Sequence, residues 1–572
     1  MTLGVLDGFP LLPWGNGMVF ECFSTRTRWM ARGGLTCATA LVLGLAVGGG
    51  PGVAQTAATG SAMVIKAALP QMTGFVQALT AAAGEDEVVA AFYRDRGFSA
   101  FWTGPDDAVR RTALIAALSQ SGLHALPEGR YDVAGLVAAF HSAASEGDRG
   151  RLEVRLTRAL LAYARDLETG ILVPAKVDAG IVREVPRRDP AAILAAFAAD
   201  PQGFLRSLPP RHPEYARLVK ARALLLAQID AGGWGPRVPA GALKPGATGP
   251  AVIALRDRLI RMGYLDRTAT ASFDAAVQAA VQEFQFDHGL TADGVAGEGT
   301  MTEINVEPAA RLRSITVAME RERWTNIDRG KRHIWVNLAD FTAKIIDDDK
   351  VTFATRAVVG STVVEKHTPE FSDLMTYMEV NPDWTVPPGI IRRDYLPKLQ
   401  ANPGALGHLQ VVDSRGRVVP RGSVNFSAYT ARNFPYNLKQ PPGASNALGK
   451  VKFMFPNPYS IYLHDTPDKH LFARENRAYS SGCVRLNDPF DFAYALLARQ
   501  EDDPKAAFHR VLDSGRQERI SLKDPVPVHL EYRTAFTNTK GRVQYRRDVY
   551  GRDAAIWSAL SRAGVAERGE RG

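Results

Sequence analysis

The sequence is poor in cysteine, with three in 572 residues. Two of them, Cys22 and Cys37, lie near the N-terminus, and Cys483 stands alone in the rest of the chain. A lone cysteine forms no disulfide within its own chain, which excludes a fold held together by such bonds. Long apolar runs are also lacking beyond the N-terminal region, which excludes further membrane spans. Hydrophobic residues make up 46% and charged residues 23%, as in ordinary globular proteins.

Nucleic-acid-binding motifs are lacking as well, although the chain is basic. The net charge is +9 and the pI is about 9.3. Such an excess attracts nucleic acid, anionic lipid or another polyanion. The charges are spread along the sequence, without an RNA-recognition, zinc-finger or helix-turn-helix pattern. We therefore expect no nucleic-acid partner, and interpret the charge as solvated surface with a weak attraction to carboxylate-bearing polymers.

The N-terminal region has the order of a secretory signal. Three arginines precede the apolar segment 35–47, and small residues follow at 52–54. We predict a signal peptide over 1–54, cleaved near Ala54, with Met30 as an alternative start. An uncleaved membrane anchor is the other interpretation of this region.

If the protein is exported, the presence of the remaining cysteine needs an explanation. Cleavage near Ala54 removes Cys22 and Cys37, so Cys483 becomes the single thiol of the mature protein. A free thiol without a function is at risk of oxidation in an oxidising compartment. We therefore expect Cys483 to have a chemical role.

The fold class that periodicity predicts is multidomain α+β. Residues 57–240 have apolar positions at helical spacing, among them Leu156, Leu160 and Tyr163. Proline-rich joints interrupt the helical pattern at several points. We predict a helical scaffold domain here, with a packing role and no chemistry of its own.

A compact module follows over 243–305. Pro250 begins a helix that Gly263 ends, and Asp274 caps a second helix that Gly289 stops. The run FQFDHGLTADGVAG, which begins in the second helix and continues past Gly289, resembles the three-helix peptidoglycan-binding module. This resemblance leaves two roles open, which are direct binding of glycan or stem peptide and bracing of the neighbouring domain.

From about Leu312 the pattern changes to strands. Segments rich in β-branched residues are bounded by turn signals such as the aspartates at 347–349. The strand-like segments are 332–338, 341–346 and 355–359. We predict a β-rich domain over 312–536, a lid-like insertion over 390–442, and a C-terminal tail over 537–572.

The most specific chemical pattern lies in 461–487. Cys483 sits in a tight turn of small residues directly after Gly482, which lets the backbone bend sharply. His464 ends an apolar and aromatic segment that is typical of a strand. A thiol becomes a strong nucleophile when an imidazole takes its proton. The residues alone therefore leave two interpretations open, which are a nucleophilic cysteine with a histidine base, and a buried cysteine beside a structural histidine.

HDTP followed by SSGCVRLN resembles the active-site signature of the L,D-transpeptidases, the YkuD-type catalytic domain. Ser481 stands where many members carry a second histidine, and serine there is typical of the large periplasmic branch. The blocks FYRDRGFSAFW, NPDWTVPPGI and GASNALGKVKFMFPN resemble the same branch. The resemblance implies a periplasmic enzyme that needs neither cofactor nor metal, with peripheral association with the envelope.

The reaction that the resemblance implies is acyl transfer between peptidoglycan stem peptides. Cys483 would attack the carbonyl of the third residue of a donor tetrapeptide, meso-diaminopimelate, with His464 as general base. The side-chain amine of an acceptor diaminopimelate would then resolve the thioester into a 3→3 cross-link. A carbapenem, which acylates an activated thiol of this kind, is an expected inhibitor.

The resemblance also implies a group of oxyanion and substrate-binding residues. They are Tyr462, Ser481, Gly482, Arg485 and Asn487. Backbone N–H groups of the Gly482–Cys483 turn would hold the oxyanion, and Tyr462 would line its pocket unless it only packs in the core. Arg485 would either bind a stem-peptide carboxylate or brace the turn. We expect a backbone carbonyl to hold His464, and Asp465 to orient the loop.

Other functions remain open at this point. A non-catalytic wall-binding protein would keep the module and a degenerate catalytic fold, but the His464, Gly482, Cys483 and Arg485 set is intact. An L,D-endopeptidase or carboxypeptidase would use the same site. A zinc site with His470 is disfavoured, because the segment lacks helical ligand spacing and offers only three candidate ligands.

Overall fold

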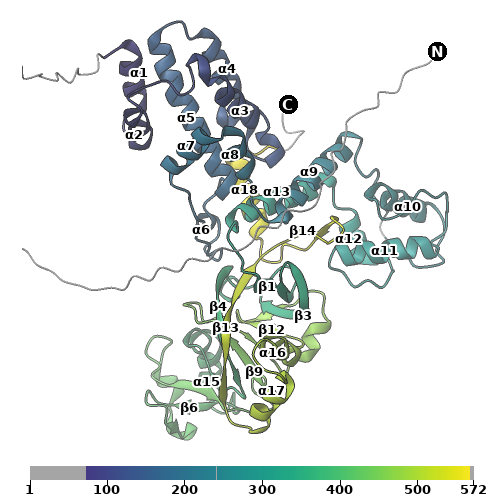
Figure 1. Cartoon of the computed structure of the whole chain (residues 1–572). Helices are drawn as coiled ribbons and strands as arrows, with labels where there is room; N and C mark the ends of the chain where they lie inside the picture. Colours follow the sequence, from purple (N-terminus) through teal and green to yellow (C-terminus); the bar gives the residue numbers. More distant parts are fainter. Residues whose placement is uncertain (1–71, 240, 567–572) are drawn as a thin grey trace, which may run out of the picture. The chain divides into compact units, whose positions relative to one another are not determined.

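The structure is a computed structural model of the chain, and it describes residues 72–239 and 241–566 (Figure 1). The predicted signal peptide, with Cys22 and Cys37, lies outside the described residues. Among the helices that are described, none is both long and apolar enough to cross a membrane.

The first part of the described chain is helical, as the sequence predicts. Its helices are α1 (Gly74–Ala83), α2 (Glu87–Asp95), α3 (Ala108–Ser119), α4 (Val133–Ser142), α5 (Glu146–Thr169), α6 (Pro174–Val177), α7 (Pro190–Ala199), α8 (Pro201–Ser207) and α9 (Pro213–Asp230). Ser145 and Asp148 form a capping box that begins α5. The core of this part includes Trp102, whose backbone N–H donates to the buried Glu153 carboxylate.

The module over 243–305 contains α10 (Pro250–Met262), α11 (Ala275–Asp287) and α12 (Glu298–Ile304). Gly263 ends α10 in the left-handed region, and the Asp274 carboxylate accepts from the Val277 N–H at the start of α11. Leu255, Val281 and other apolar residues are fully buried between the helices. The predicted three-helix module is therefore present.

The boundary predicted at Leu312 falls inside a helix, α13 (Pro308–Trp324). This helix is buried nearly all round, although its second half alternates acidic and basic residues. Arg321 pairs with Glu370 at 2.9 Å, and Arg323 pairs with Glu320 at 2.8 Å. Because these charges pair with one another inside the protein, the helix does not separate into an apolar and a polar face. A search for an amphipathic pattern therefore does not predict it.

A nine-stranded sheet forms the core of the following region, which confirms the predicted β-rich part of an α+β protein. Its order is β11-β3-β12-β10-β9-β4-β13-β1-β2, and β2 also pairs with β3, which closes the sheet into a barrel. The strands are β1 (Arg332–Asn337), β2 (Thr342–Asp347), β3 (Lys350–Gly360), β4 (Phe371–Val380), β9 (Val451–Met454), β10 (Leu463–His464), β11 (Ala478–Ser480), β12 (Val484–Leu486) and β13 (Glu518–Glu531). Helices α16 (Pro489–Leu497) and α17 (Pro504–Asp513) lie between β12 and β13 in sequence.

The segment 390–442 is an ordered insertion with secondary structure of its own. It follows β5 (Trp384–Thr385) and α14 (Pro388–Ile390), and contains α15 (Leu396–Ala401), β6 (Gln410–Val412), β7 (Val418–Val419) and β8 (Asn437–Gln440). These strands form a small sheet in the order β5-β8-β6-β7. Leu399, Val411 and Phe426 of the insertion are buried.

The segment predicted as a tail, 537–572, is folded over its described part. It contains β15 (Val543–Tyr545), which pairs with β14 (Ala535–Thr537), and α18 (Arg552–Arg562). Ile556 and Leu560 of α18 are buried against Ile181 and Trp324. The apolar face of α18 is short and flanked by charged residues. The local sequence therefore does not predict that this helix packs against partners far away in the chain.

Candidate active site

Two short parallel strands bring His464 beside the cysteine turn. His464 is the last residue of β10, and Cys483 immediately precedes β12. The register pairs His464 with Arg485, and the Val484 N–H donates to the Tyr462 carbonyl at 3.1 Å. The end of β10 and the turn that carries Cys483 are therefore neighbours, as the sequence predicts.

Hydroxyl groups fix the turn that carries Cys483. Gly482 has a φ of 129°, a region that favours glycine, and an added Cβ would lie 3.2 Å from Ile461 Cδ1. Ser480 Oγ accepts from the Gly482 N–H at 3.0 Å and donates to the Cys483 carbonyl at 2.6 Å. Thr368 Oγ1 donates to the Gly482 carbonyl at 2.6 Å. The turn is therefore held from both sides.

These contacts change the expected set of oxyanion donors. The Gly482 N–H already donates to Ser480, so it is not free for an oxyanion in this conformation. The Cys483 N–H has no acceptor among the described residues. Of the two backbone donors expected from the sequence, Cys483 is the one that remains available.

His464 is held in a defined tautomer. It is 4% exposed, and its Nδ1 donates to the Asp465 carbonyl, the backbone partner expected from the sequence. Nε2 is thereby left as the proton acceptor. Burial, aided by the positive charge of Arg485, lowers the pKa of His464 to about 3, so the imidazole is neutral near pH 7.

The thiol is also neutral at rest. Cys483 is half-buried, and its Sγ–H points to the Ser460 carbonyl at 3.5 Å. Burial raises the pKa of the Cys483 thiol, while hydrogen bonds from Tyr462 and the charges of Lys452 and Arg485 act in the opposite direction. The resting pair is therefore thiol and imidazole rather than thiolate and imidazolium.

Tyr462 lies between the histidine and a cation. Its ring centroid is 5.6 Å from that of His464, and Lys452 Nζ lies 4.7 Å from its ring centroid. Burial raises the pKa of Tyr462 well above its usual value, so the hydroxyl stays protonated. It is thus both a core side chain and a hydrogen-bond donor beside Cys483.

The remaining predicted residues differ in their contacts. Arg485 Nη1 pairs with Asp468 Oδ2 at 3.0 Å, which ties β12 to the loop after His464. Asn487 donates from its side chain to Asp488 at 2.8 Å, at the start of α16. Ser481 is exposed in the turn. The contacts of Asn487 are therefore structural, and those of Arg485 brace the loop.

Asp465 orients the loop, as its place next to His464 predicts. Its carboxylate accepts from the Lys450 N–H at 2.9 Å and pairs with Lys469 at 2.8 Å. Gly449, with a φ of 62°, leaves room for this carboxylate, because an added Cβ would lie 2.2 Å from it.

Two residues outside 461–487 support the turn, and no local pattern in the sequence indicates either of them. Thr368 Oγ1, besides its bond to Gly482, accepts from the Gly360 N–H at 2.9 Å. Tyr550, from the predicted tail, donates to the Gly360 carbonyl at 2.6 Å. Thr368 lies in the HTPEF block, but a threonine in an extended segment carries no local mark of such a role.

No group of three or more His, Cys, Asp or Glu side chains within 72–239 and 241–566 is placed to hold a metal ion. His470 is exposed on the loop after His464.

Comparisons with known proteins agree with this arrangement. Residues 331–528 match the model of the "L,D-transpeptidase catalytic domain", 248–304 that of the "Putative peptidoglycan binding domain", and 87–221 that of a "Scaffold domain". A "Putative L,D-transpeptidase" of Haemophilus influenzae is 32% identical over 253 residues, which are 44% of this chain and 50% of that protein. The chain thus spans about half the length of this curated relative.

Solved structures with the same name are more distant. The L,D-transpeptidases of Xylanimonas cellulosilytica and Stackebrandtia nassauensis are each 15% identical and cover 52% of this chain, with 98% and 97% of their own chains covered. Their TM-scores are 0.16 and 0.21, so we draw no conclusion from them.

The site thus belongs to a β-rich region, with the one cysteine of the described residues in the turn before β12 and a buried histidine at the end of the adjacent β10. Residues 331–528 thus resemble the L,D-transpeptidase catalytic domain, and residues 248–304 before them resemble a peptidoglycan-binding domain.

Proposed function

We propose that this protein is a peptidoglycan L,D-transpeptidase that forms 3→3 cross-links through a thioester on Cys483. The observation that supports it most is a neutral His464, fixed by the Asp465 carbonyl, beside the one cysteine of the described residues. This constellation lies within the region that matches the L,D-transpeptidase catalytic domain.

In the first half-reaction, His464 Nε2 takes the thiol proton as Cys483 Sγ attacks the carbonyl of the donor's diaminopimelate. The Cys483 N–H and the Tyr462 hydroxyl stabilise the oxyanion. The C–N bond then breaks, and the imidazolium returns its proton to the departing D-alanine. Because thiol and imidazole are both neutral at rest, the charges arise only during the reaction.

In the second half-reaction, the side-chain amine of an acceptor diaminopimelate attacks the thioester. His464 takes the proton from the amine and returns it to the departing sulfur, which regenerates the thiol. Water attack would give a tripeptide instead, so water must be excluded from the thioester.

We assign this water exclusion to the insertion 390–442. Asp394 of the insertion pairs with Lys366 at 3.1 Å, and the Lys366 carbonyl lies 4.0 Å from the place of a Cβ on Gly482. The insertion therefore contacts a residue that neighbours the cysteine turn, where a closing segment would protect the acyl-enzyme. Peptidoglycan as substrate also places the protein in the cell envelope, and we propose the periplasm.

Purified protein incubated with disaccharide tetrapeptides tests the proposal. We expect 3→3 dimers by mass spectrometry, and a carbapenem adduct on Cys483. Cys483→Ala should abolish both, and His464→Ala should slow acylation by about 10²–10⁴. His470→Ala, on the exposed part of the same segment, is the matched control and should leave both rates unchanged. Dimer formation by Cys483→Ala at the parent rate would refute the mechanism.

A further inference from the structure

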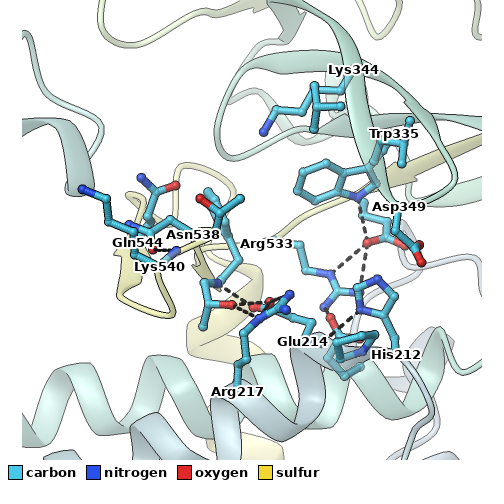
Figure 2. A pocket seen from close by; sticks show the side chains of 18 of the residues that line it. His212, Glu214, Arg217, Trp335, Lys344, Asp349, Arg533, Asn538, Lys540 and Gln544 are labelled. Atoms are coloured by element: carbon cyan, nitrogen blue, oxygen red, sulfur yellow. Dashed lines mark hydrogen bonds and ion pairs between the residues drawn. The ribbon is translucent and has the colours of Figure 1, made fainter. Parts of the chain in front are cut away.

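A cavity of about 670 Å³ lies apart from the cysteine turn, and none of the residues around Cys483 lines it. Its walls come from α9, from α11 of the peptidoglycan-binding domain, from β1 and β2, and from the hairpin of β14 and β15 (Figure 2). A volume of this size is typical of sites for small ligands. We call it the Trp335 cavity, after the indole on β1 that lines it.

Trp335 is a fixed aromatic surface in this cavity. Its Nε1–H donates to Glu531 Oε2 at 3.0 Å, and its ring meets Phe536 edge to face at 6.2 Å between centroids. Phe286 of α11 adds a second ring, which is 62% exposed. Because the Trp335 ring is already held in place, a ligand binds against its apolar surface without the entropy cost of ordering that side chain.

Most acidic side chains that line the cavity are already neutralised by arginine. Five of the six have such a partner, and the pairs are Glu214 with Arg217 at 3.0 Å, Glu283 with Arg542 at 3.1 Å, Asp287 with Arg542 at 3.7 Å, Glu531 with Arg533 at 2.9 Å, and Glu322 with Arg533. Figure 2 shows Arg533 and its contacts with other residues that line the cavity. Charges paired in this way contribute little to the attraction of a ligand.

Three lining charges have no ion-pair partner among the described residues. Lys344 lies opposite Trp335 in the strand register, and its Nζ is 5.2 Å from the centroid of the Trp335 ring. Lys540 comes from the β14–β15 turn, and Asp349 from the exposed turn between β2 and β3. The cavity therefore offers two free ammonium groups and one free carboxylate around an aromatic wall.

We propose that the Trp335 cavity is a second peptide-binding site, which takes a wall peptide with a free amino-acid end. Carboxylates of the peptide lie against Lys344 and Lys540, its ammonium group against Asp349, and its aliphatic chain against Trp335. A diaminopimelate side chain combines these three features. The identity of the ligand rests on the proposed function, whereas the charge pattern that selects it does not.

The β2–β3 hairpin supplies matched controls for the test. Asp348 and Lys350 are exposed neighbours of Asp349, and neither lines the cavity. Asp348→Asn and Lys350→Gln thus change the same charges on the same hairpin as the test variants. Both aspartates have a positive φ, which asparagine also adopts readily.

Titration of the free stem tetrapeptide into full-length protein whose Cys483 carries a carbapenem adduct measures the second site alone. We expect the Lys344→Gln/Lys540→Gln double variant to bind at least tenfold more weakly, and Asp349→Asn about threefold more weakly. N-acetylation of the peptide amine should reproduce the Asp349→Asn loss in the parent and add nothing in that variant. Both controls should bind within twofold of the parent.

Binding by the double variant within twofold of the parent would overturn the proposal, as would an equal loss in the controls. If no adduct forms on Cys483, the proposed function fails, and the same titration in Cys483→Ala still tests the cavity. The two failures are therefore distinguishable. Unchanged thermal unfolding of each variant shows that a loss of binding is not a loss of fold.

Discussion

The cysteine turn and the Trp335 cavity are built from opposite kinds of polar contact. Neutral hydroxyl groups of Ser480 and Thr368 hold the turn, and its thiol and imidazole are uncharged at rest. Ion pairs such as Arg533 with Glu531 hold the wall of the cavity. A site that must create charge during a reaction is served by neutral supports, whereas a site that recognises charge needs fixed ones.

The largest expected effect comes from breaking the ion pairs of the cavity. Arg533 is 3% exposed and contacts Glu322, Glu531 and Thr325. Arg533→Met leaves the buried Glu322 and Glu531 with Arg329 as their remaining ion-pair partner, at 3.5 and 3.8 Å, so the free energy of unfolding should fall by about 3–5 kcal/mol in urea titrations.

The same variant sharpens the comparison. Its folded fraction, at low temperature, should acylate with a carbapenem at the parent rate, because the turn does not depend on these pairs. Arg516→Met, at an exposed pair 3.6 Å apart, is the control and should change stability by less than about 1 kcal/mol. A large loss of acylation in folded Arg533→Met would show that the two regions are coupled.

The next effect is the acid sensitivity of the cysteine site. Burial lowers the pKa of His464 from 6.5 to about 3. Between these values the unfolded chain binds a proton that the folded chain does not, so stability is fully present above pH 6.5 and is lost as the pH falls toward 3.

From about pH 7.5 to 4.5 we expect His464 to cost on the order of 2 kcal/mol of stability. His464→Gln should remove this part of the pH dependence in urea titrations, and the exposed His470→Gln should retain all of it. Equal pH dependence in parent and His464→Gln would mean that the buried imidazole is not neutral.

A smaller effect should come from the support of the turn. Thr368 is fully buried, and Thr368→Val leaves the Gly482 carbonyl and the Gly360 N–H without their partner. We expect a loss of about 1–3 kcal/mol in stability and a roughly tenfold slower acylation, with the pH midpoint of the rate unchanged. Thr368→Ser keeps the hydroxyl and should restore the rate; if it does not, the methyl packing matters rather than the hydrogen bonds.

The sequence predicts well what local signals determine. His464 at a strand end and Cys483 in a tight glycine turn are short-range features, and both are present in the structure. The caps of α10 and α11 are equally local, with Gly263 and Asp274 in the predicted roles.

What the sequence does not reveal depends on distant partners. Tyr550 supports the turn through Gly360, far away in the sequence, and α13 hides its charges in ion pairs with other elements. The Trp335 cavity combines residues from α9, α11 and the β14–β15 hairpin, so no single segment carries its pattern. The predicted oxyanion role of the Gly482 N–H also depended on a side chain, Ser480, whose rotamer a sequence does not specify.

The smallest effect concerns an ion pair at the cysteine site, Arg485 with Asp468, and it separates the two roles left open for Arg485. Asp468 has a side chain that is 49% exposed, so Asp468→Asn should change stability by less than about 1 kcal/mol. Its charge partly offsets that of Arg485, which lowers the pKa of both His464 and the Cys483 thiol. Asp468→Asn should therefore lower the thiol pKa further and speed carbapenem labelling near neutral pH about twofold. Arg485→Gln should slow labelling, because the thiol pKa rises without the cation.

If Arg485 also binds a stem carboxylate, Asp468→Asn frees it and lowers the KM for tetrapeptide. A raised KM and slower labelling in Asp468→Asn would instead mean that the pair is needed to brace the loop.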